Sequence, residues 1–133
     1  MRHFLRNRWK SISVAIVACL VFSVIGVSVL IGGQVREAIC LAQATEPGDP
    51  IRALLAVANS TNYSISERNT AIWSLGQLGS SRALEPLVAL YTGASCPGSS
   101  DLCQYELEKA INLCRGDLNI GALIWRHGEF ASR

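Results

Sequence analysis

The N-terminal part of the chain contains an uninterrupted apolar stretch. Residues 11–33 (SISVAIVACLVFSVIGVSVLIGG) include no charged side chain. At a rise of about 1.5 Å per residue, a helix of this length spans about 34 Å, which is enough to cross the hydrocarbon core of a bilayer. A helix also satisfies its backbone hydrogen bonds internally where no water is present. The pattern predicts a transmembrane helix over residues 11–33.

Beyond residue 33, apolar residues recur with the period of an α-helix in several short segments. Ala71, Leu75 and Leu78 follow one another at steps of four and three, which places them on one helical face. No segment alternates with the two-residue period of a strand. The pattern therefore predicts an all-α domain over residues 34–133. Its expected helices cover residues 34–45, 49–60, 64–79, 81–92, 101–115 and 117–128.

These predicted helices form pairs that repeat along the chain. Residues 35–58 align with residues 68–91 at an offset of 33, and a third copy follows at an offset of 36. One helix pair cannot bury its apolar faces alone, and about three pairs are needed for a stable stack. The repeat predicts a short α-solenoid of three stacked pairs, which is close to the minimum size.

The predicted helix ends carry recognisable start and stop signals. Ser64 and Glu67 have the spacing of a capping box, and Asp49 precedes a proline at the first position of its helix. Gly79 and Gly116 stand where a left-handed residue would close the preceding helix. The boundaries are therefore predicted from local chemistry as well as from periodicity.

The central copy resembles a known repeat family. Its residues 71–79 (AIWSLGQLG), followed by Arg82-Ala83-Leu84, are similar to the HEAT family, and specifically to the HEAT-like repeats of phycobilisome lyases. The first copy departs from the motif with LAQ at residues 41–43, and the third with INLCR at residues 111–115. The resemblance implies a scaffold that binds other proteins, or in some members a chromophore lyase.

Charge is distributed unevenly and predicts a topology. Arg2, Arg6, Arg8 and Lys10 precede the apolar stretch with no acid among them. By the positive-inside rule, residues 1–10 form a basic cytoplasmic stub and the helical domain lies on the extracytoplasmic side, in the periplasm or an equivalent space. The rest of the chain, residues 34–133, is mildly acidic, with 8 basic against 10 acidic residues. Nothing in this balance points to nucleic acid.

A cleaved signal peptide is the main alternative to a retained anchor. The triplet Ala42-Gln43-Ala44 resembles a small-residue cleavage site before Thr45. However, the apolar region of a signal peptide is usually only about 7–15 residues long. Cleavage after Ala44 would also remove the first predicted helix of the domain, so the sequence favours retention.

Four of the five cysteines lie beyond the apolar stretch, and Cys19 lies within it. Cys96 and Cys103 are separated by a Pro-Gly turn, so the sequence predicts a disulfide between them in an oxidising space. Cys114 occupies an inward position of its helix and is expected to be a buried thiol. A bridge between Cys40 and Cys114 is the alternative.

Little in the sequence points to catalysis. The chain has two histidines, His3 and His127, and neither stands in a pattern that would converge with other metal ligands. Glu106 and Glu108 are two apart on a helix and therefore diverge. We expect no catalytic site, no metal and no cofactor.

Two surfaces are candidates for partner contacts. The second helices of stacked pairs usually line the concave side. Here they carry Arg52, Arg82, Glu85, Asn119, Trp125 and Arg126. Trp125 replaces a small residue of the other copies, and it either seals the end of the stack or contacts a partner. Within the apolar stretch, Ala15, Cys19 and Ser23 form a small-residue face that could pack on another membrane helix.

The leading functional hypothesis is a membrane-tethered protein–protein interaction module. Such a module would serve as a scaffold or a single-span accessory subunit of a larger membrane or envelope complex, with other integral or envelope proteins as partners. The resemblance leaves a chromophore-lyase-like role as an alternative. A thiol-redox role through Cys96 and Cys103 is the other alternative, because Cys103 lies near the start of a helix.

Overall fold

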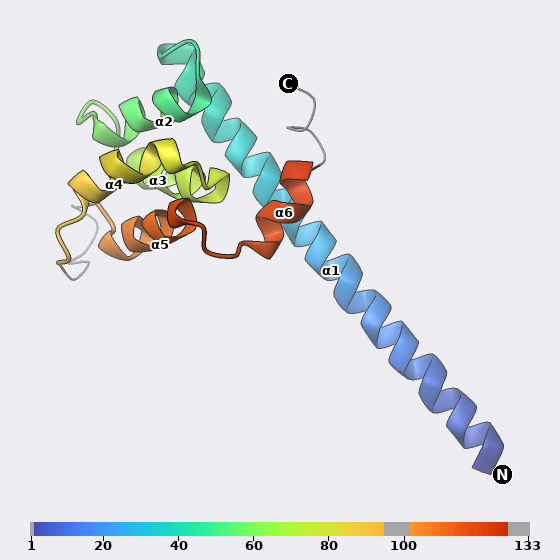
Figure 1. Ribbon diagram of the computed structural model, residues 1–133. Coiled ribbons are helices and arrows are strands. Elements are labelled where there is room, and N and C mark those ends of the chain that lie inside the picture. Colours follow the sequence, from blue (N-terminus) through green and yellow to red (C-terminus); the bar gives the residue numbers. More distant parts are fainter. Residues whose placement is uncertain (1, 95–101, 128–133) are drawn as a thin grey trace.

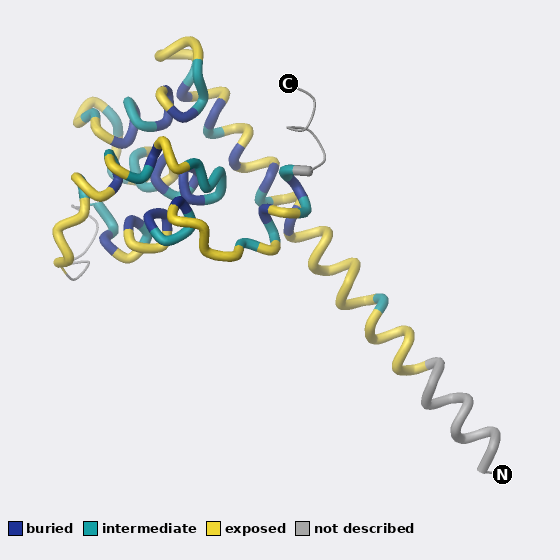
Figure 2. Tube along the Cα trace, viewed as in Figure 1, coloured by how far each residue is buried: buried dark blue, intermediate teal, exposed yellow. Residues whose placement is uncertain are grey.

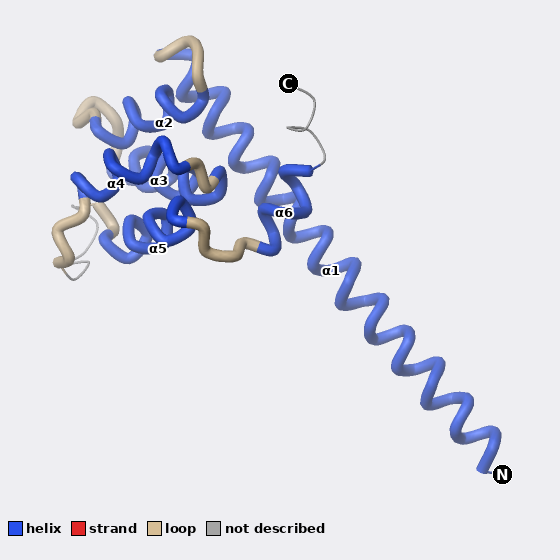
Figure 3. Tube along the Cα trace, in the orientation of Figure 1, coloured by secondary structure: helices blue, strands red, loops and turns tan. Residues whose placement is uncertain are grey.

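The computed structural model describes residues 2–94 and 102–127, and the side chains of residues 12–94 and 102–126. Within these ranges all regular structure is helical, as the sequence predicted (Figures 1 and 3). The elements are α1 (Arg2–Thr45), α2 (Pro50–Asn59), α3 (Ile65–Leu78), the 3₁₀-helix η1 (Ser81–Ala83), α4 (Leu84–Leu90), α5 (Gln104–Arg115) and α6 (Ile120–His127).

Helix α1 joins the predicted membrane helix and the first helix of the domain into one element. It projects from the domain as a long rod, and its side chains are largely exposed from Ile12 to Val27 (Figure 2). From Ser28 onward one side is buried, including Gly32 and Val35. The domain therefore begins to contact α1 before the predicted boundary at residues 33 and 34. By length and composition α1 can cross a membrane, although a signal sequence has the same features.

The predicted helix caps are confirmed. The Ser64 hydroxyl accepts a hydrogen bond from the Glu67 N–H, and the Glu67 carboxylate accepts one from the Ser64 N–H. Asp49 accepts from the Arg52 N–H at the start of α2. The C-caps of α3 and α5 are Gly79 (φ 58°) and Gly116 (φ 114°), whose positive φ values suit a residue without Cβ.

Helices α1 to α5 pack in sequence around one apolar core. Helix α2 contacts both α1 and α3, while α5 packs against α3 and α4. The largest fully buried apolar side chains come from several of these helices, so no pair is buried independently. They are Val35, Leu54, Ile72, Leu75, Leu87 and Leu107. This packing is compatible with a short solenoid.

Helix α6 departs from the predicted stack. As the second helix of a third pair, it was expected to close the free end of the solenoid beside α5. Instead, the linker after Gly116 carries it away from α5, and α6 lies alongside α1 (Figures 1 and 3). Trp125 packs on Gly32, where a Cβ would lie 3.0 Å from the Trp125 Cβ. The absence of a side chain at Gly32 therefore makes room for the indole.

Two polar side chains of the α6 region fix it to the end of α3. The Asn119 amide nitrogen donates to Gln77 Oε1 (2.9 Å), and its Oδ1 accepts from the Ala122 N–H (3.0 Å) at the start of α6. Arg126 Nε donates to the Gln77 carbonyl (2.9 Å). A cation at the C-terminal end of α3 is favoured by the helix dipole. Helix α6 therefore bridges α1 and α3.

Candidate partner-binding groove

An open groove of about 1000 Å³ runs between α1 and α3. The second half of α1 forms one wall, and α3 with part of α5 forms the other. Helix α2 lies beneath, where Leu54 and Val57 form the floor. Other lining residues are Gln34, Glu37, Ala38, Leu41, Ala42, Ala44, Thr45, Tyr63, Ser66, Glu67, Asn69, Thr70, Ala71, Trp73, Glu106 and Lys109. The groove thus belongs mainly to the first helices of the three copies.

Apolar and aromatic side chains provide the contact surface of this groove. Leu41 lines the groove from its α1 wall, and its side chain is 68% exposed. Tyr63 and Trp73 are half-buried, so that part of each ring remains accessible. Aromatic rings with one face packed and the other accessible supply large contact areas in protein interfaces. The groove can therefore bury apolar side chains of a partner.

The margin of the groove is acidic. Among the described residues that line it, three are acidic (Glu37, Glu67 and Glu106) and one, Lys109, is basic. Lys109 Nζ lies 3.8 Å from Glu106 Oε1, so it offsets that carboxylate first. Hydrogen bonds from Ser64 lower the pKa of Glu67, so this carboxylate stays charged to a lower pH than an ordinary glutamate. The groove therefore presents net negative charge around an apolar floor.

Close approach of α3 and α5 determines the shape of the second wall. At Gly76 a Cβ would lie 2.8 Å from the Cα of Ala110, so the two helices touch at backbone level. Helices α1 and α3 also contact each other, and α2 packs against both, with Leu54 fully buried beneath the groove. The groove thus lies where α1, α2 and α3 meet.

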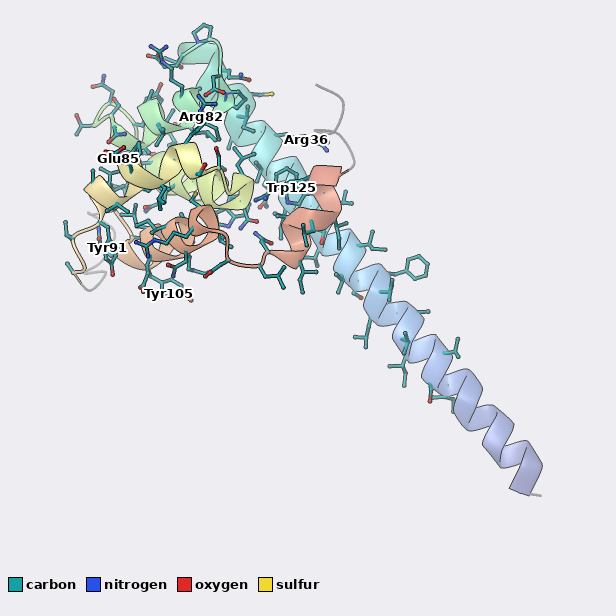
Figure 4. All side chains as sticks on the ribbon, viewed as in Figure 1. Arg36, Arg82, Glu85, Tyr91, Tyr105 and Trp125 are labelled. Atoms are coloured by element: carbon teal, nitrogen blue, oxygen red, sulfur yellow. The ribbon has the colours of Figure 1, made fainter. Side chains whose placement is uncertain are left out.

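The six predicted partner residues lie in two separate regions. Arg52, Arg82 and Glu85 are exposed on the side of α2 and α4, and Figure 4 labels two of them there. None of the three lines the groove. Their role in partner binding stays a prediction.

The other three predicted partner residues make contacts within the domain. Trp125 is only 4% exposed and lies beside α1 (Figure 4). Asn119 and Arg126 bind Gln77 of α3. Trp125 therefore packs within the domain against α1 and not at the free end of the stack, and its role in partner binding stays a prediction.

The small-residue face of the apolar stretch is accessible. Ala15, Cys19 and Ser23 are all exposed on α1, and the Ser23 hydroxyl donates to the Cys19 carbonyl within the helix. Such a face permits close approach of a second helix in a membrane. Its use for packing stays a prediction.

The cysteines have different surroundings. Cys96 lies outside the described residues, so the bridge to Cys103 stays a prediction; Cys103 precedes α5, and its N–H donates to Asn69 Oδ1 (3.0 Å). Cys40 is exposed on α1, whereas Cys114 is buried and its thiol faces the Leu75 carbonyl (3.6 Å). The alternative Cys40–Cys114 bridge is therefore not formed. Burial raises the pKa of Cys114, which opposes thiolate chemistry there.

One comparison with known proteins agrees with this architecture. An all-helical domain of packed helix pairs is the class of fold that the structure defines. Residues 67–92, which contain α3, η1 and α4, match the family model of the PBS lyase HEAT-like repeat. This segment is a HEAT-like repeat, as its sequence motif indicated. No curated protein and no solved structure gives a significant match to the chain.

Proposed function

We propose that this protein is a membrane-tethered interaction module whose groove between α1 and α3 binds a segment of another protein. The groove is the single observation that carries this proposal, because it combines an accessible apolar surface with an acidic margin. Helical-repeat folds commonly bind proteins through such extended surfaces. The HEAT-like repeat at residues 67–92 supports the same class of function.

The chemistry of the groove specifies its partner segment. Exposed Leu41 and half-buried Trp73 favour apolar side chains, while Glu37 and Glu67 favour Lys or Arg beside them. An amphipathic segment with apolar anchors and basic flanks satisfies both requirements. We therefore propose a partner segment of this kind.

The position of the groove also restricts where the partner lies. Its α1 wall begins at Gln34, directly after the apolar stretch that we propose to cross the membrane. At about 1.5 Å per residue, residues 34–45 extend only about 17 Å beyond that stretch. A partner in this groove is thus held close to the membrane surface, as expected for an accessory subunit of a membrane or envelope complex.

The anchor and its topology are tested on the chain as it occurs in cells. The intact mass of membrane-extracted protein should correspond to a chain that retains residues 11–33. If the four basic residues before this stretch stay in the cytoplasm, as we propose, added protease should reach the helical domain from the other side of the membrane only. A product that starts at Thr45 and leaves the membrane in a salt wash would refute the anchor.

Charge insertion tests the groove. We expect Leu41→Asp to reduce partner recovery from mild-detergent extracts by about tenfold or more, because it places a carboxylate in an apolar contact. Val88→Asp is the matched control, since Val88 is 44% exposed on α4 and lies outside the groove. Partners are identified by mass spectrometry, and equal recovery with both variants would contradict the groove as the binding site.

A further inference from the structure

Helix α6 packs across the end of the apolar stretch in α1. Two close contacts define this arrangement: Gly121 faces the Ser28 hydroxyl, and Trp125 faces Gly32. Both pairs differ by 93 in residue number, so the two helices advance together in the same direction. The start of α6 is therefore the end that points toward the N-terminal, apolar part of α1 (Figure 1).

The start of α6 exposes apolar side chains on the face turned away from α1. Leu118 in the preceding linker is 77% exposed, Ile120 is 60% exposed and Leu123 is 46% exposed. The opposite face is buried on α1 through Ala122 and Trp125. In water such a group of exposed aliphatic side chains is unfavourable, because apolar surface is stabilised when it is removed from water.

The register with α1 places these residues beside the apolar stretch. The offset of 93 holds within α6 and sets Ile120 and Leu123 level with residues 27 and 30 of α1, while Leu118 lies two residues before α6 in the linker. The α1 residues at these levels are Val27 and Leu30, which are also large, apolar and exposed. Exposed apolar side chains of both helices therefore lie at similar levels, and we call Val27, Leu30, Leu118, Ile120 and Leu123 the apolar belt.

Both α6 and this part of α1 begin with apolar residues and become polar or charged toward their C-terminal ends. The end of α6 carries Arg126, which is level with Gly33, and α1 becomes polar at Gln34 and Arg36 immediately beyond. The linker begins with Asp117, whose N–H donates to the Asn112 carbonyl and so stays close to α5. The apolar end and the polar end of both helices thus coincide, as at the surface of a bilayer.

We infer that the start of α6, with Leu118, Ile120 and Leu123, inserts into the lipid of the same membrane that α1 crosses. The inference rests on the anchor proposed above. Residues 25–33 cover about 12 Å of helix, and amphipathic elements at interfaces insert by about 5–10 Å. The apolar belt therefore lies at the boundary between headgroups and acyl chains.

We favour lipid as the material that covers this apolar belt, because the belt adjoins the part of α1 whose apolar side chains are exposed on all sides. A second contact with the bilayer would also restrict the tilt of the domain about α1. Arg126 and Asn119 fix α6 to α3, and α3 forms one wall of the groove. A restricted tilt of α6 therefore also restricts the orientation of the groove. Insertion of α6 thus sets the height and direction in which the groove faces its partner.

Site-specific photo-crosslinking of the full chain in phosphatidylcholine nanodiscs tests this inference. A diazirine-bearing amino acid replaces Leu118 in one variant and Ile120 in a second, and lipid adducts are measured by mass spectrometry. Leu20, 62% exposed in the proposed span, reports on the anchor, and Val88 on α4 reports on background. We expect adduct yields at Leu118 and Ile120 about tenfold or more above Val88, because acyl chains surround both positions.

The positions in this set separate the possible results. Adducts at Leu20 but background yields at both Leu118 and Ile120 would overturn the insertion of α6 and leave the anchor intact. Adducts between two copies of the chain at Leu118, in place of lipid adducts, would also overturn it. Background yield at Leu20 itself would overturn the anchor together with the inference.

Discussion

Arg82 binds Asp49, the residue that occupies the equivalent position one repeat earlier in the chain. The guanidinium donates from Nη1 to Oδ1 (3.1 Å) and from Nη2 to Oδ2 (2.9 Å). Their separation of 33 residues equals the offset between the first two copies. Asp49 also caps α2, so one carboxylate both starts a helix and joins it to the next repeat.

The two members of this pair should contribute unequally to stability. Arg82→Ala removes an exposed ion pair and is expected to lower the free energy of unfolding by about 0.5 kcal/mol. Asp49→Ala removes the N-cap as well and should cost about 1 kcal/mol more. Thermal unfolding of the full chain in detergent, followed by circular dichroism, measures both. A larger loss for Arg82→Ala than for Asp49→Ala would contradict the capping role.

The contribution of the pair should depend on pH at acidic values. The hydrogen bond from Arg82 lowers the pKa of Asp49 below its ordinary value of 3.8. Its stabilising effect is therefore present above pH 3.8 and is lost as the pH falls through the lower pKa of the folded state. We expect the difference in melting temperature between the wild type and Arg82→Ala to shrink in this range. A difference that grows on acidification would refute this assignment.

Adjacent glycines in α1 should respond differently to substitution by alanine. A Cβ at Gly32 would lie 3.0 Å from the Trp125 Cβ, whereas a Cβ at Gly33 meets nothing within 4 Å. Gly32→Ala should displace α6 and accelerate amide hydrogen exchange at residues 120–127 by about tenfold, since overpacking costs about 1–3 kcal/mol. Gly33→Ala should leave this exchange unchanged while favouring the helix. Similar exchange in both variants would contradict the contact.

The close crossing of α3 and α5 should make Gly76 intolerant of any side chain. Its Cβ would lie 2.8 Å from the Cα of Ala110, which is backbone and cannot rotate away. Gly76→Ala is expected to lower the free energy of unfolding by about 1–3 kcal/mol despite the better helix propensity of alanine. Melting in detergent measures the loss, with Gly33→Ala as the matched control. An increase in melting temperature would disprove the tight crossing.

The predicted Cys96–Cys103 bridge is open to direct measurement. Its loop of about 8 residues would stabilise the folded chain by about 2–3 kcal/mol in the chain-entropy model. Peptide mapping under non-reducing conditions should therefore recover these two cysteines in one linked species. Alkylation of both thiols in the folded protein would exclude the bridge.

The local features of the helices could be predicted from the sequence because they depend on neighbouring residues. The capping box at Ser64 and the glycine at residue 79 specify helix ends through contacts within one turn. The buried position of Cys114 followed from the repeat, since it takes the place of an inward residue one copy earlier. Period and capping were sufficient for these assignments.

The groove could not be predicted in the same way. Its walls come from first helices, whereas general repeat geometry indicated the second helices. The deciding feature is the packing of α1, α2 and α3 against one another, which brings residues far apart in the chain to one groove. Leu41 and Trp73 are apolar residues within helices, so the sequence pattern alone does not show that Leu41 is exposed and Trp73 only half-buried.

By itself, the sequence determined the all-helical class, the repeat of 33 residues and the apolar stretch, because periodicity and composition act along the chain. Only the tertiary structure decided that α6 packs on α1 instead of completing the third pair. An apolar helical face requires burial but does not specify which neighbour provides it. Gly32 and Trp125 complement each other across 93 residues, and complementarity of shape at that distance leaves no periodic signal in the sequence.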